Sequence, residues 1–445
     1  MMESNTMEKR TDDDINVLPE SSDEDFSNEE QGSVENVLKL VKSAAQLSVD
    51  NIECTPGSQQ GDNYMSIIKR VQVRGKRRMC SGKSKVFSIS LIFKRQFLNP
   101  QRRKLFRSDE AFANEITVYD QLIPVMKRFS QDRLPFPVCH YAGKDSEGDL
   151  IVMEDLTYCG FHMVDRRQNL SYRQCRTVVE ELANFHAVSL AMKLVKPAQF
   201  ENMKQKVTEI VYTDAAAEFY TRSLETSLRG TLDSLHYSNK DGSLDAAIKA
   251  IEHLSGRMYQ IMSAVVRGSH EPYKVLCHGD AWVNNFMFNE SHDEVKLIDL
   301  QTTRYTSPVI DILHLLYTST SVEIRNTHTV ELLHNYQHAL IKALRLYVPE
   351  KDKSGLPELE ATFSYESIRA EYDERIMYGL GIAMWLLPAV TFHPDQIPDL
   401  DTVTMKDFET DSHQKTIAQM LSPDFHTRMK DTVLEFYRKG FLDNI

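Results

Sequence analysis

One group of polar residues constrains this chain more than any other: Asp280, then four residues, Asn285, and later Asp299. The runs 275–277, 286–288 and 295–298 around these residues are largely apolar. Short apolar runs bounded by polar turns are typical of buried β-strands. We therefore expect short strands to hold both carboxylates and the amide on rigid backbone.

The spacing of these residues indicates phosphoryl transfer. In kinase catalytic loops an aspartate that takes the acceptor proton is followed, after four residues, by an asparagine that binds magnesium. A second hard oxygen ligand is needed, because Mg²⁺ prefers oxygen donors. Asp280 would be the base, and Asn285 and Asp299 the metal ligands. An ordinary polar loop explains Asp280 or Asn285 taken alone, but explains the combination with Asp299 less well.

A lysine and a glutamate upstream fit the same chemistry. Residues 86–94 alternate and then run apolar, as a sheet strand does, and end at Lys94. Glu115 lies in the helix-like stretch 110–122. Lys94 would reach the nucleotide phosphates and Glu115 would hold it, as the strand lysine and helix glutamate of kinases do. Taken separately, the two residues are typical of a surface lysine and a solvated glutamate. The order lysine, glutamate, Asp280, Asn285 and Asp299 along the chain favours a phosphate-binding ion pair instead.

Two further segments are candidates for nucleotide binding. The stretch 57–64 contains Gly61 and leads into 65–73, which alternates loosely like a first strand and could cover the phosphates. A loop with two glycines is also an ordinary turn, so this is supporting information only. The apolar strand 150–153 ends at Glu154 and Leu156, and backbone groups there could bind an adenine edge between two lobes.

Taken together, these motifs resemble the ecdysteroid kinase-like (CHK kinase-like) family, within the choline kinase and aminoglycoside phosphotransferase superfamily. The residues that carry the resemblance are Asn63-Tyr64, Phe93-Lys94, Phe112 with Glu115 and Tyr119, Met153-Glu154-Asp155-Leu156, Leu182-Ala183-Asn184-Phe185-His186-Ala187, His278-Gly279-Asp280-Ala281-Trp282 with Asn285, Ile298-Asp299-Leu300-Gln301, and Ser307-Pro308 with Asp311.

The resemblance implies an α+β, bilobal protein kinase-like fold, in which an N-terminal antiparallel sheet lobe with one helix precedes a larger, mainly helical lobe. It implies ATP and Mg²⁺ as cofactors. Carried over by position, it makes Asp280 the catalytic base, Asn285 and Asp299 the magnesium ligands, and Lys94 with Glu115 the phosphate-orienting ion pair. Asp311 would be a structural brace beneath the catalytic loop.

Departures from protein kinases narrow the acceptor. The triplet that ends in Asp280 lacks the arginine of protein kinases, leucine and glutamine follow Asp299 in place of phenylalanine and glycine, and no A-P-E segment follows. A small molecule is therefore the expected acceptor. The family resemblance implies ecdysteroids as one acceptor class, with other hydrophobic alcohols open.

Charge and composition indicate how the chain divides into segments. Its formal charge is −12, but the first thirty residues hold eleven acids against Lys9 and Arg10. We expect residues 1–32 to be a disordered acidic tail, 33–152 the ATP-binding lobe, and 153–445 the helical lobe with the catalytic and acceptor site, its core at about 150–345. Helical spacing predicts helices at 178–192, 309–316, 330–348 and 431–441.

Other partners are not predicted. Basic clusters at 74–85 and 102–107 lack interleaved aromatic residues, so solvated turns explain them better than nucleic-acid binding does. The apolar stretch 376–392 contains glycines and a proline and is short for a bilayer, which predicts a buried helix. Six scattered cysteines and an acidic start favour the cytoplasm without disulfides. No protein partner is predicted.

Two rival functions stay open at this stage. A metallohydrolase could use His278 and Asp280 with His334 and His338, which fall about one helical turn apart, although no third ligand accompanies them. A pseudokinase could bind a nucleotide or small ligand without turnover. The sequence argues against it, since Lys94, Glu115, Asp280, Asn285 and Asp299 are all present.

Overall fold

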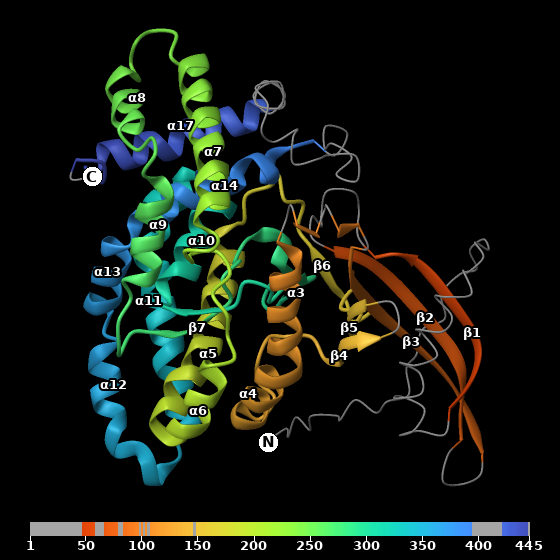
Figure 1. The fold of residues 1–445 in the computed structure, drawn as a ribbon. Helices are drawn as coiled ribbons and strands as arrows, with labels where there is room; N and C mark the ends of the chain where they lie inside the picture. The colour runs from red at the N-terminus through yellow and green to blue at the C-terminus, as the bar shows by residue number, and fades with distance from the viewer. Residues whose placement is uncertain are drawn as a thin grey trace, which may run out of the picture.

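The computed structural model describes residues 47–57, 66–78, 83–97, 99–100, 103–104, 107–145, 148–393 and 421–443. These residues form two lobes, a curved sheet and a larger helical body, with two helices between them (Figure 1). This is the α+β, bilobal arrangement that the sequence predicts. The expected acidic tail at 1–32 lies outside the described residues.

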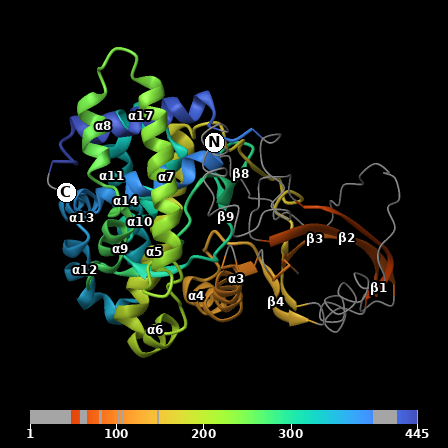
Figure 2. The ribbon, with the colours of Figure 1, turned by 45° about the horizontal axis from the view of Figure 1, so that its top comes forward.

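The N-terminal lobe is built on a five-stranded antiparallel sheet with the strand order β1-β2-β3-β5-β4. Its strands are β1 (Leu47–Pro56), β2 (Ser66–Arg78), β3 (Ser84–Gln96), β4 (Cys139–Asp145) and β5 (Gly148–Glu154). Figure 2 shows how strongly β1, β2 and β3 curve. Alternate residues of β2 and β3, such as Val71, Val73, Leu91 and Phe93, form a small apolar core.

The strands that the sequence predicts at 65–73, 86–94 and 150–153 are present as β2, β3 and β5, but β2 is not the first strand of the sheet. Residues 65–73 were expected to begin the sheet, but β1 precedes them in the chain and pairs with β2. β1 is an edge strand whose described residues are half-buried or exposed, so its sequence carries no clear apolar alternation.

A helical stretch joins the sheet to the second lobe. It comprises α3 (Ser108–Thr117), the π-turn η1 (Val118–Leu122) and α4 (Ile123–Ser130). The sequence predicts a single helix at 110–122, and the structure adds a π-turn and a second helix after it. Phe112, Tyr119 and Leu122 are buried in this stretch. Helix α3 packs against β3, β4 and β5, and η1 packs against β4.

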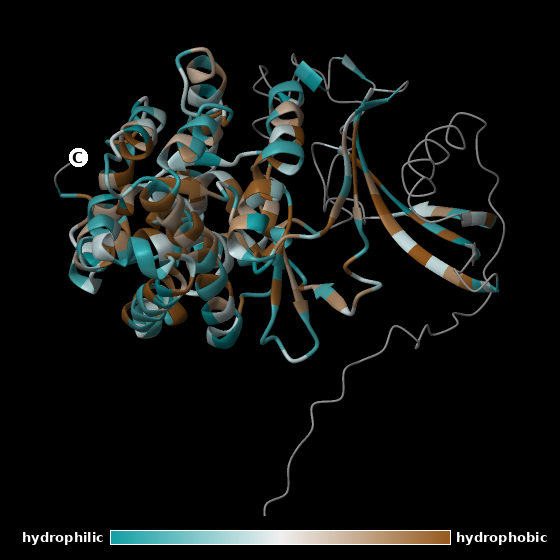
Figure 3. Ribbon diagram, turned by 90° about the horizontal axis from the view of Figure 1, so that it is seen from below, coloured by the Kyte–Doolittle hydropathy of each residue, from teal (hydrophilic) through white to brown (hydrophobic). Residues whose placement is uncertain are grey.

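The helical lobe surrounds one large apolar core (Figure 3). Its helices are α5 (Tyr172–Val195), α6 (Pro197–Lys204), α7 (Ala217–Ser238), α8 (Asp245–Glu252), α9 (Met258–Arg267), α10 (Val309–Ser319), α11 (Val322–Tyr347), η3 (Glu350–Gly355), α12 (Leu356–Thr362), α13 (Tyr365–Glu374), α14 (Ile376–Thr391) and α17 (Pro423–Arg438). The predicted helices at 178–192 and 309–316 fall within α5 and α10. Helix α11 covers 330–347 of the third, and α17 covers 431–438 of the fourth.

The apolar stretch at 376–392 is the buried helix that the sequence predicts. Helix α14 packs against α10, α7, α9 and α17, and most of its side chains are inaccessible to solvent. Within the described part of the chain, no helix combines the length and apolar character that crossing a bilayer requires.

Short strands carry the segment on which the sequence reading rests. They are β6 (Phe161–Met163), β7 (Val275–Cys277), β8 (Phe286–Asn289), β9 (Val295–Leu297) and β10 (Arg304–Thr306), with the 3-10 turn η2 (Val283–Asn285) before β8. β7 pairs with β10, and β8 lies between β6 and β9. The three strands expected around Asp280, Asn285 and Asp299 are therefore present.

Candidate active site

The loop after β7 is fixed by a buried carboxylate on α10. Asp311 Oδ2 accepts a hydrogen bond from the His278 N–H at 2.7 Å, and Oδ1 accepts one from the Gly279 N–H at 2.9 Å. His186 Nε2 lies 3.1 Å from Asp311 Oδ2, and its Nδ1 lies 2.9 Å from the Tyr336 hydroxyl. Asp311 thus occupies the bracing position implied by the resemblance, and His186 is a core histidine with both ring nitrogens engaged.

Gly279 lets this loop lie directly on the turn after Asp299. Its φ is +85°, in the left-handed region, and a Cβ there would be 2.0 Å from the Thr302 carbonyl oxygen. His278 completes the contact, because its Nε2–H donates to the Ile298 carbonyl at 2.9 Å. His278, two residues before Asp280, is therefore joined to the residue directly before Asp299, and this fixes the two aspartates relative to each other.

Asp280 and Asn285 are in direct contact. Asn285 Nδ2 donates to the Asp280 backbone carbonyl at 2.8 Å and to Asp280 Oδ2 at 2.9 Å. Burial and the nearby charge of Asp299 raise the pKa of Asp280 to about 7. A carboxylate with a pKa near neutrality is suited to accept a proton at physiological pH.

Lys94, at the far end of β3, contacts two carboxylates. Its Nζ lies 2.8 Å from Glu115 Oε2 on α3 and 2.9 Å from Asp299 Oδ1. Burial alone would lower the pKa of Lys94, but Asp299 and Glu115 together raise it above its usual value. Burial raises the pKa of Glu115 to about 7 against the opposing effect of Lys94. The fold thus joins three of the predicted site residues through one ammonium group.

The residues between the lobes have separate contacts. Glu154 Oε1 accepts the Val138 N–H at 2.7 Å, so this side chain holds the approach to β4. Leu156 is buried with Phe161 and Met287, and Ile298 packs beside them. Leu156 is itself a predicted nucleotide-binding residue, and Ile298 directly precedes the predicted metal ligand Asp299. Gly61, the remaining predicted nucleotide residue, lies outside the described residues.

Asp155 links the two lobes, which the sequence reading did not foresee. Its Oδ2 accepts hydrogen bonds from Arg70 Nε and from Ser90 Oγ, both at 2.7 Å, and Oδ1 accepts from the Thr157 N–H at 3.1 Å. Arg70 and Ser90 lie on β2 and β3. One carboxylate therefore ties the segment after β5 to both long strands of the sheet.

A histidine and a tyrosine on the helical lobe also adjoin Asp280. His314 Nε2 lies 3.4 Å from Asp280 Oδ1, and its Nδ1 lies 3.2 Å from the Tyr378 hydroxyl. Burial lowers the pKa of His314 to about 3, so its ring is neutral at physiological pH. The sequence gives a partial indication that His314 lies near the site, because it follows Asp311 by three residues and thus lies on the same side of α10. Tyr378 gave no such signal.

Metal ligation fits the oxygens of the site better than any histidine group. Asn285 turns both Nδ2 hydrogen bonds toward Asp280, which leaves its Oδ1 as an oxygen donor, and Asp299 supplies a carboxylate. Carboxylate and amide oxygens are the ligands that Mg²⁺ prefers. The donor set of Asn285 and Asp299 is therefore compatible with magnesium.

The histidines proposed for a metallohydrolase do not form a centre. His334 and His338 are exposed on α11, and His334 stacks on Tyr365 with ring centroids 3.7 Å apart. Within the described ranges, the one cluster of three potential metal ligands is His186, Cys277 and Asp311. There His186 bonds Asp311 and Tyr336, Asp311 also accepts the N–H groups of His278 and Gly279, and Cys277 Sγ donates to the backbone carbonyls of residues 306 and 307. This cluster is a structural brace.

The sheet lobe, the helical lobe and the polar loop between them define a protein with a protein kinase-like fold. Comparison with known proteins gives the family directly. The model of the ecdysteroid kinase-like family matches residues 60–347, and the chain belongs to this family. Family and fold together support a small-molecule kinase. No curated protein matches the sequence significantly.

Several solved structures are similar over most of the chain, at low identity. An ethanolamine kinase of Plasmodium vivax is 11% identical, with a TM-score of 0.41, and the match covers 91% of this chain and 92% of that one. A type I macrolide 2′-phosphotransferase is 11% identical, with a TM-score of 0.34 and coverage of 89% and 98%. A choline/ethanolamine kinase family protein from Mesorhizobium loti is 12% identical, with a TM-score of 0.33 and coverage of 90% and 99%.

Proposed function

We propose that this protein is an ATP- and magnesium-dependent kinase that phosphorylates a hydroxyl of a small hydrophobic acceptor, such as an ecdysteroid or a related alcohol. The observation that carries the proposal is the contact of Lys94 Nζ with both Glu115 and Asp299, at 2.8 and 2.9 Å. Lys94 and Asp299 are 205 residues apart in the chain. Membership of the ecdysteroid kinase-like family supports the acceptor class.

The nucleotide would lie between the lobes. In this proposal Lys94 exchanges its contact with Asp299 for the ATP phosphates, while Glu115 keeps it oriented. The backbone at Glu154 and Leu156 would bind the adenine edge, and buried Leu156 would pack against the base. The stretch around Gly61 would cover the phosphates.

Asp280 would act on the acceptor. The acceptor oxygen attacks the γ-phosphorus, the bond from that phosphorus to the β-phosphate oxygen breaks, ADP leaves, and the hydroxyl proton passes to Asp280. The pKa of about 7 leaves a substantial ionised fraction of this carboxylate at neutral pH. Asn285 fixes the rotamer of Asp280 through its 2.9 Å hydrogen bond. Bound through Asn285 and Asp299, Mg²⁺ would neutralise charge that develops on the phosphates.

The proposal is tested by incubating the full-length protein with ATP, Mg²⁺ and pools of steroids and other small alcohols. Mass spectrometry should detect an acceptor that has gained one phosphoryl group, together with an equal amount of ADP. Nucleotide binding without any phosphorylated product would instead favour a pseudokinase, which binds but does not turn over. Absence of magnesium-dependent nucleotide binding would contradict the proposal as a whole.

A further inference from the structure

Asn114, next to Glu115 on α3, bonds two different segments of the helical lobe. Its Nδ2 donates to the carbonyl oxygens of Gln301 at 3.0 Å and Thr303 at 3.1 Å. Its Oδ1 accepts a hydrogen bond from the Thr208 N–H at 3.2 Å. Asn114 is 3% exposed, so these bonds form away from water, where leaving a backbone group unpaired is costly.

The first partner segment is the turn after Asp299. Lys94 binds the side chain of Asp299, and the amide of Asn114 binds the backbone carbonyls of residues 301 and 303. Glu115 and Asn114 are consecutive on α3, so one turn of helix positions both the ion pair and the turn. A shift of α3 would therefore disturb both together.

The second partner lies between α6 and α7, at residues 205–216, called here the 205–216 segment. Glu209 Oε1 accepts the N–H groups of Val211 and Tyr212 at 2.8 and 3.0 Å. Glu209 Oε2 also lies 3.5 Å from Nε of the buried Arg304. The Arg304 guanidinium in turn lies 5.1 Å from the centroid of the Tyr212 ring.

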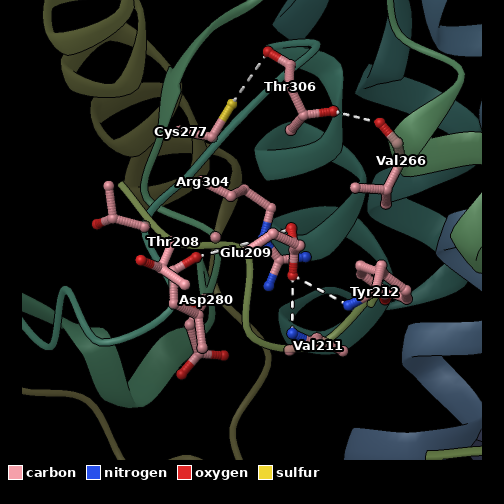
Figure 4. A network of polar contacts seen from close by, with 12 residues as sticks. Thr208, Glu209, Val211, Tyr212, Val266, Cys277, Asp280, Arg304 and Thr306 are labelled. Carbon is pink, nitrogen blue, oxygen red and sulfur yellow. Dashed lines mark hydrogen bonds and ion pairs between the residues drawn. The ribbon is translucent and has the colours of Figure 1, made fainter. Parts of the chain in front are cut away.

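This segment belongs to the surroundings of Asp280. Figure 4 shows Thr208, Glu209 and Arg304 in one group of polar residues with Asp280. The charge of Arg304 is close enough to oppose the rise in the pKa of Asp280 that burial causes. The 205–216 segment comes from the helical lobe, whereas Lys94 and Glu115 come from the nucleotide side. The 205–216 segment is therefore suited to form the wall of the acceptor pocket beside Asp280.

We propose that Asn114 is a positioning residue that couples nucleotide binding to the order of the 205–216 segment on the acceptor side. The inference rests on the proposed function, because it takes the nucleotide to bind at Lys94 and Asp299. A nucleotide that holds Lys94, Glu115 and the turn after Asp299 fixes the helix that carries Asn114. The fixed amide then holds the Thr208 N–H, so the wall beside Asp280 is best ordered when the nucleotide is bound.

Hydrogen exchange of the full-length protein, with and without a non-hydrolysable ATP analogue and Mg²⁺, tests this coupling without knowledge of the acceptor. In the wild type the analogue should slow exchange in the 205–216 segment about fivefold or more, the lower end of typical coupling between sites. Asn114→Ala and Thr208→Pro should each bind the analogue yet lose this slowing. The proline variant removes the N–H that reaches Asn114 and leaves the side chain of Asn114 free to bond residues 301 and 303, so it tests the acceptor arm separately.

A matched control is Asn184→Ala. Asn184 Nδ2 also donates to a backbone carbonyl, that of Arg133 at 2.7 Å, but this more exposed bond touches neither the 205–216 segment nor the turn after Asp299. This variant should keep the slowing. A purely structural role of Asn114 would speed exchange by the same factor with and without nucleotide.

The outcomes separate the two proposals. Nucleotide binding to the wild type with unchanged exchange in the 205–216 segment would overturn the coupling alone, and so would full slowing in Asn114→Ala. If Asn114→Ala does not fold, retained slowing in Thr208→Pro overturns it equally. A wild-type protein that binds no nucleotide would overturn the proposed function and this inference with it.

Discussion

Replacing Asp280 by asparagine should stabilise the protein while it removes the proposed base. Burial and repulsion by Asp299 raise the pKa of Asp280 from 3.8 to about 7. Ionisation of Asp280 is therefore less favourable in the folded protein than in the unfolded chain, and it lowers the free energy of unfolding. Asparagine keeps the shape of the side chain and carries no charge, so it avoids that cost.

The magnitude follows from linkage between pKa and folding. A rise of about three pKa units corresponds to at most about 4 kcal/mol, at roughly 1.4 kcal/mol for each unit. The side chain is 21% exposed. Because water screens part of the charge, we expect a gain of about 1–3 kcal/mol for Asp280→Asn at pH 8.

The sign depends on pH in a defined window. Well below pH 3.8, the usual pKa of an aspartate, the carboxyl is protonated in both the folded and the unfolded protein, and it contributes nothing to the pH dependence. Between pH 4 and about 7 the unfolded chain ionises while the folded protein keeps its proton, so the wild type loses stability as pH rises. Above about pH 7 both are ionised and the cost stays constant. The advantage of the variant should therefore grow between pH 5 and pH 8.

Urea unfolding of both proteins at pH 5 and pH 8, without nucleotide or divalent cations, measures this effect. Asp293→Asn is a suitable control, because hydrogen bonds from Ser291 and Asn289 lower the pKa of exposed Asp293 and give it no such cost. An Asp280→Asn variant that is no more stable than wild type at pH 8, with no growth of the difference from pH 5, would refute the reasoning.

Two further substitutions test other parts of the site. Gly279→Ala should destabilise the protein by more than about 3 kcal/mol in urea unfolding, since it combines a positive φ with a backbone clash. Gly160→Ala is its control, because Gly160 has the same φ of +85° but nothing within 4 Å of an added Cβ, and equal losses would contradict the close contact with Thr302. Lys94→Met should lower kcat/KM for ATP about 100-fold or more, as loss of one preorganised charged donor does, and unchanged kinetics would remove Lys94 from the phosphate site.

Much of the site could be predicted because its chemistry needs particular residue types at a fixed spacing. The run from Asp280 to Asn285 and the strand before Asp299 are local, so their sequence reports their structure directly. The contact of Lys94 with Glu115 joins two different elements, so local sequence does not report it. It could be predicted because Lys94 ends a strand, Glu115 lies on the next helix, and the family resemblance pairs these two positions.

The remaining contacts depend on packing that the sequence does not encode locally. Asn114 acts through backbone carbonyls and an N–H, which leave no side-chain pattern at the partner positions. Asp155 read as part of a polar turn, yet it is buried against Arg70 and Ser90. β1 was missed because an edge strand needs little apolar alternation. In each case tertiary contacts, and not local propensity, determine the structure.

The most direct test of the account separates nucleotide binding from turnover at Asp280. Wild type and Asp280→Asn should be compared for binding of ATP with Mg²⁺ by calorimetry, and for phosphorylation of an acceptor by mass spectrometry. We expect similar nucleotide affinity in both proteins and a phosphorylated product with the wild type only. Normal turnover by Asp280→Asn would contradict the role of Asp280 as the base and, with it, the central claim.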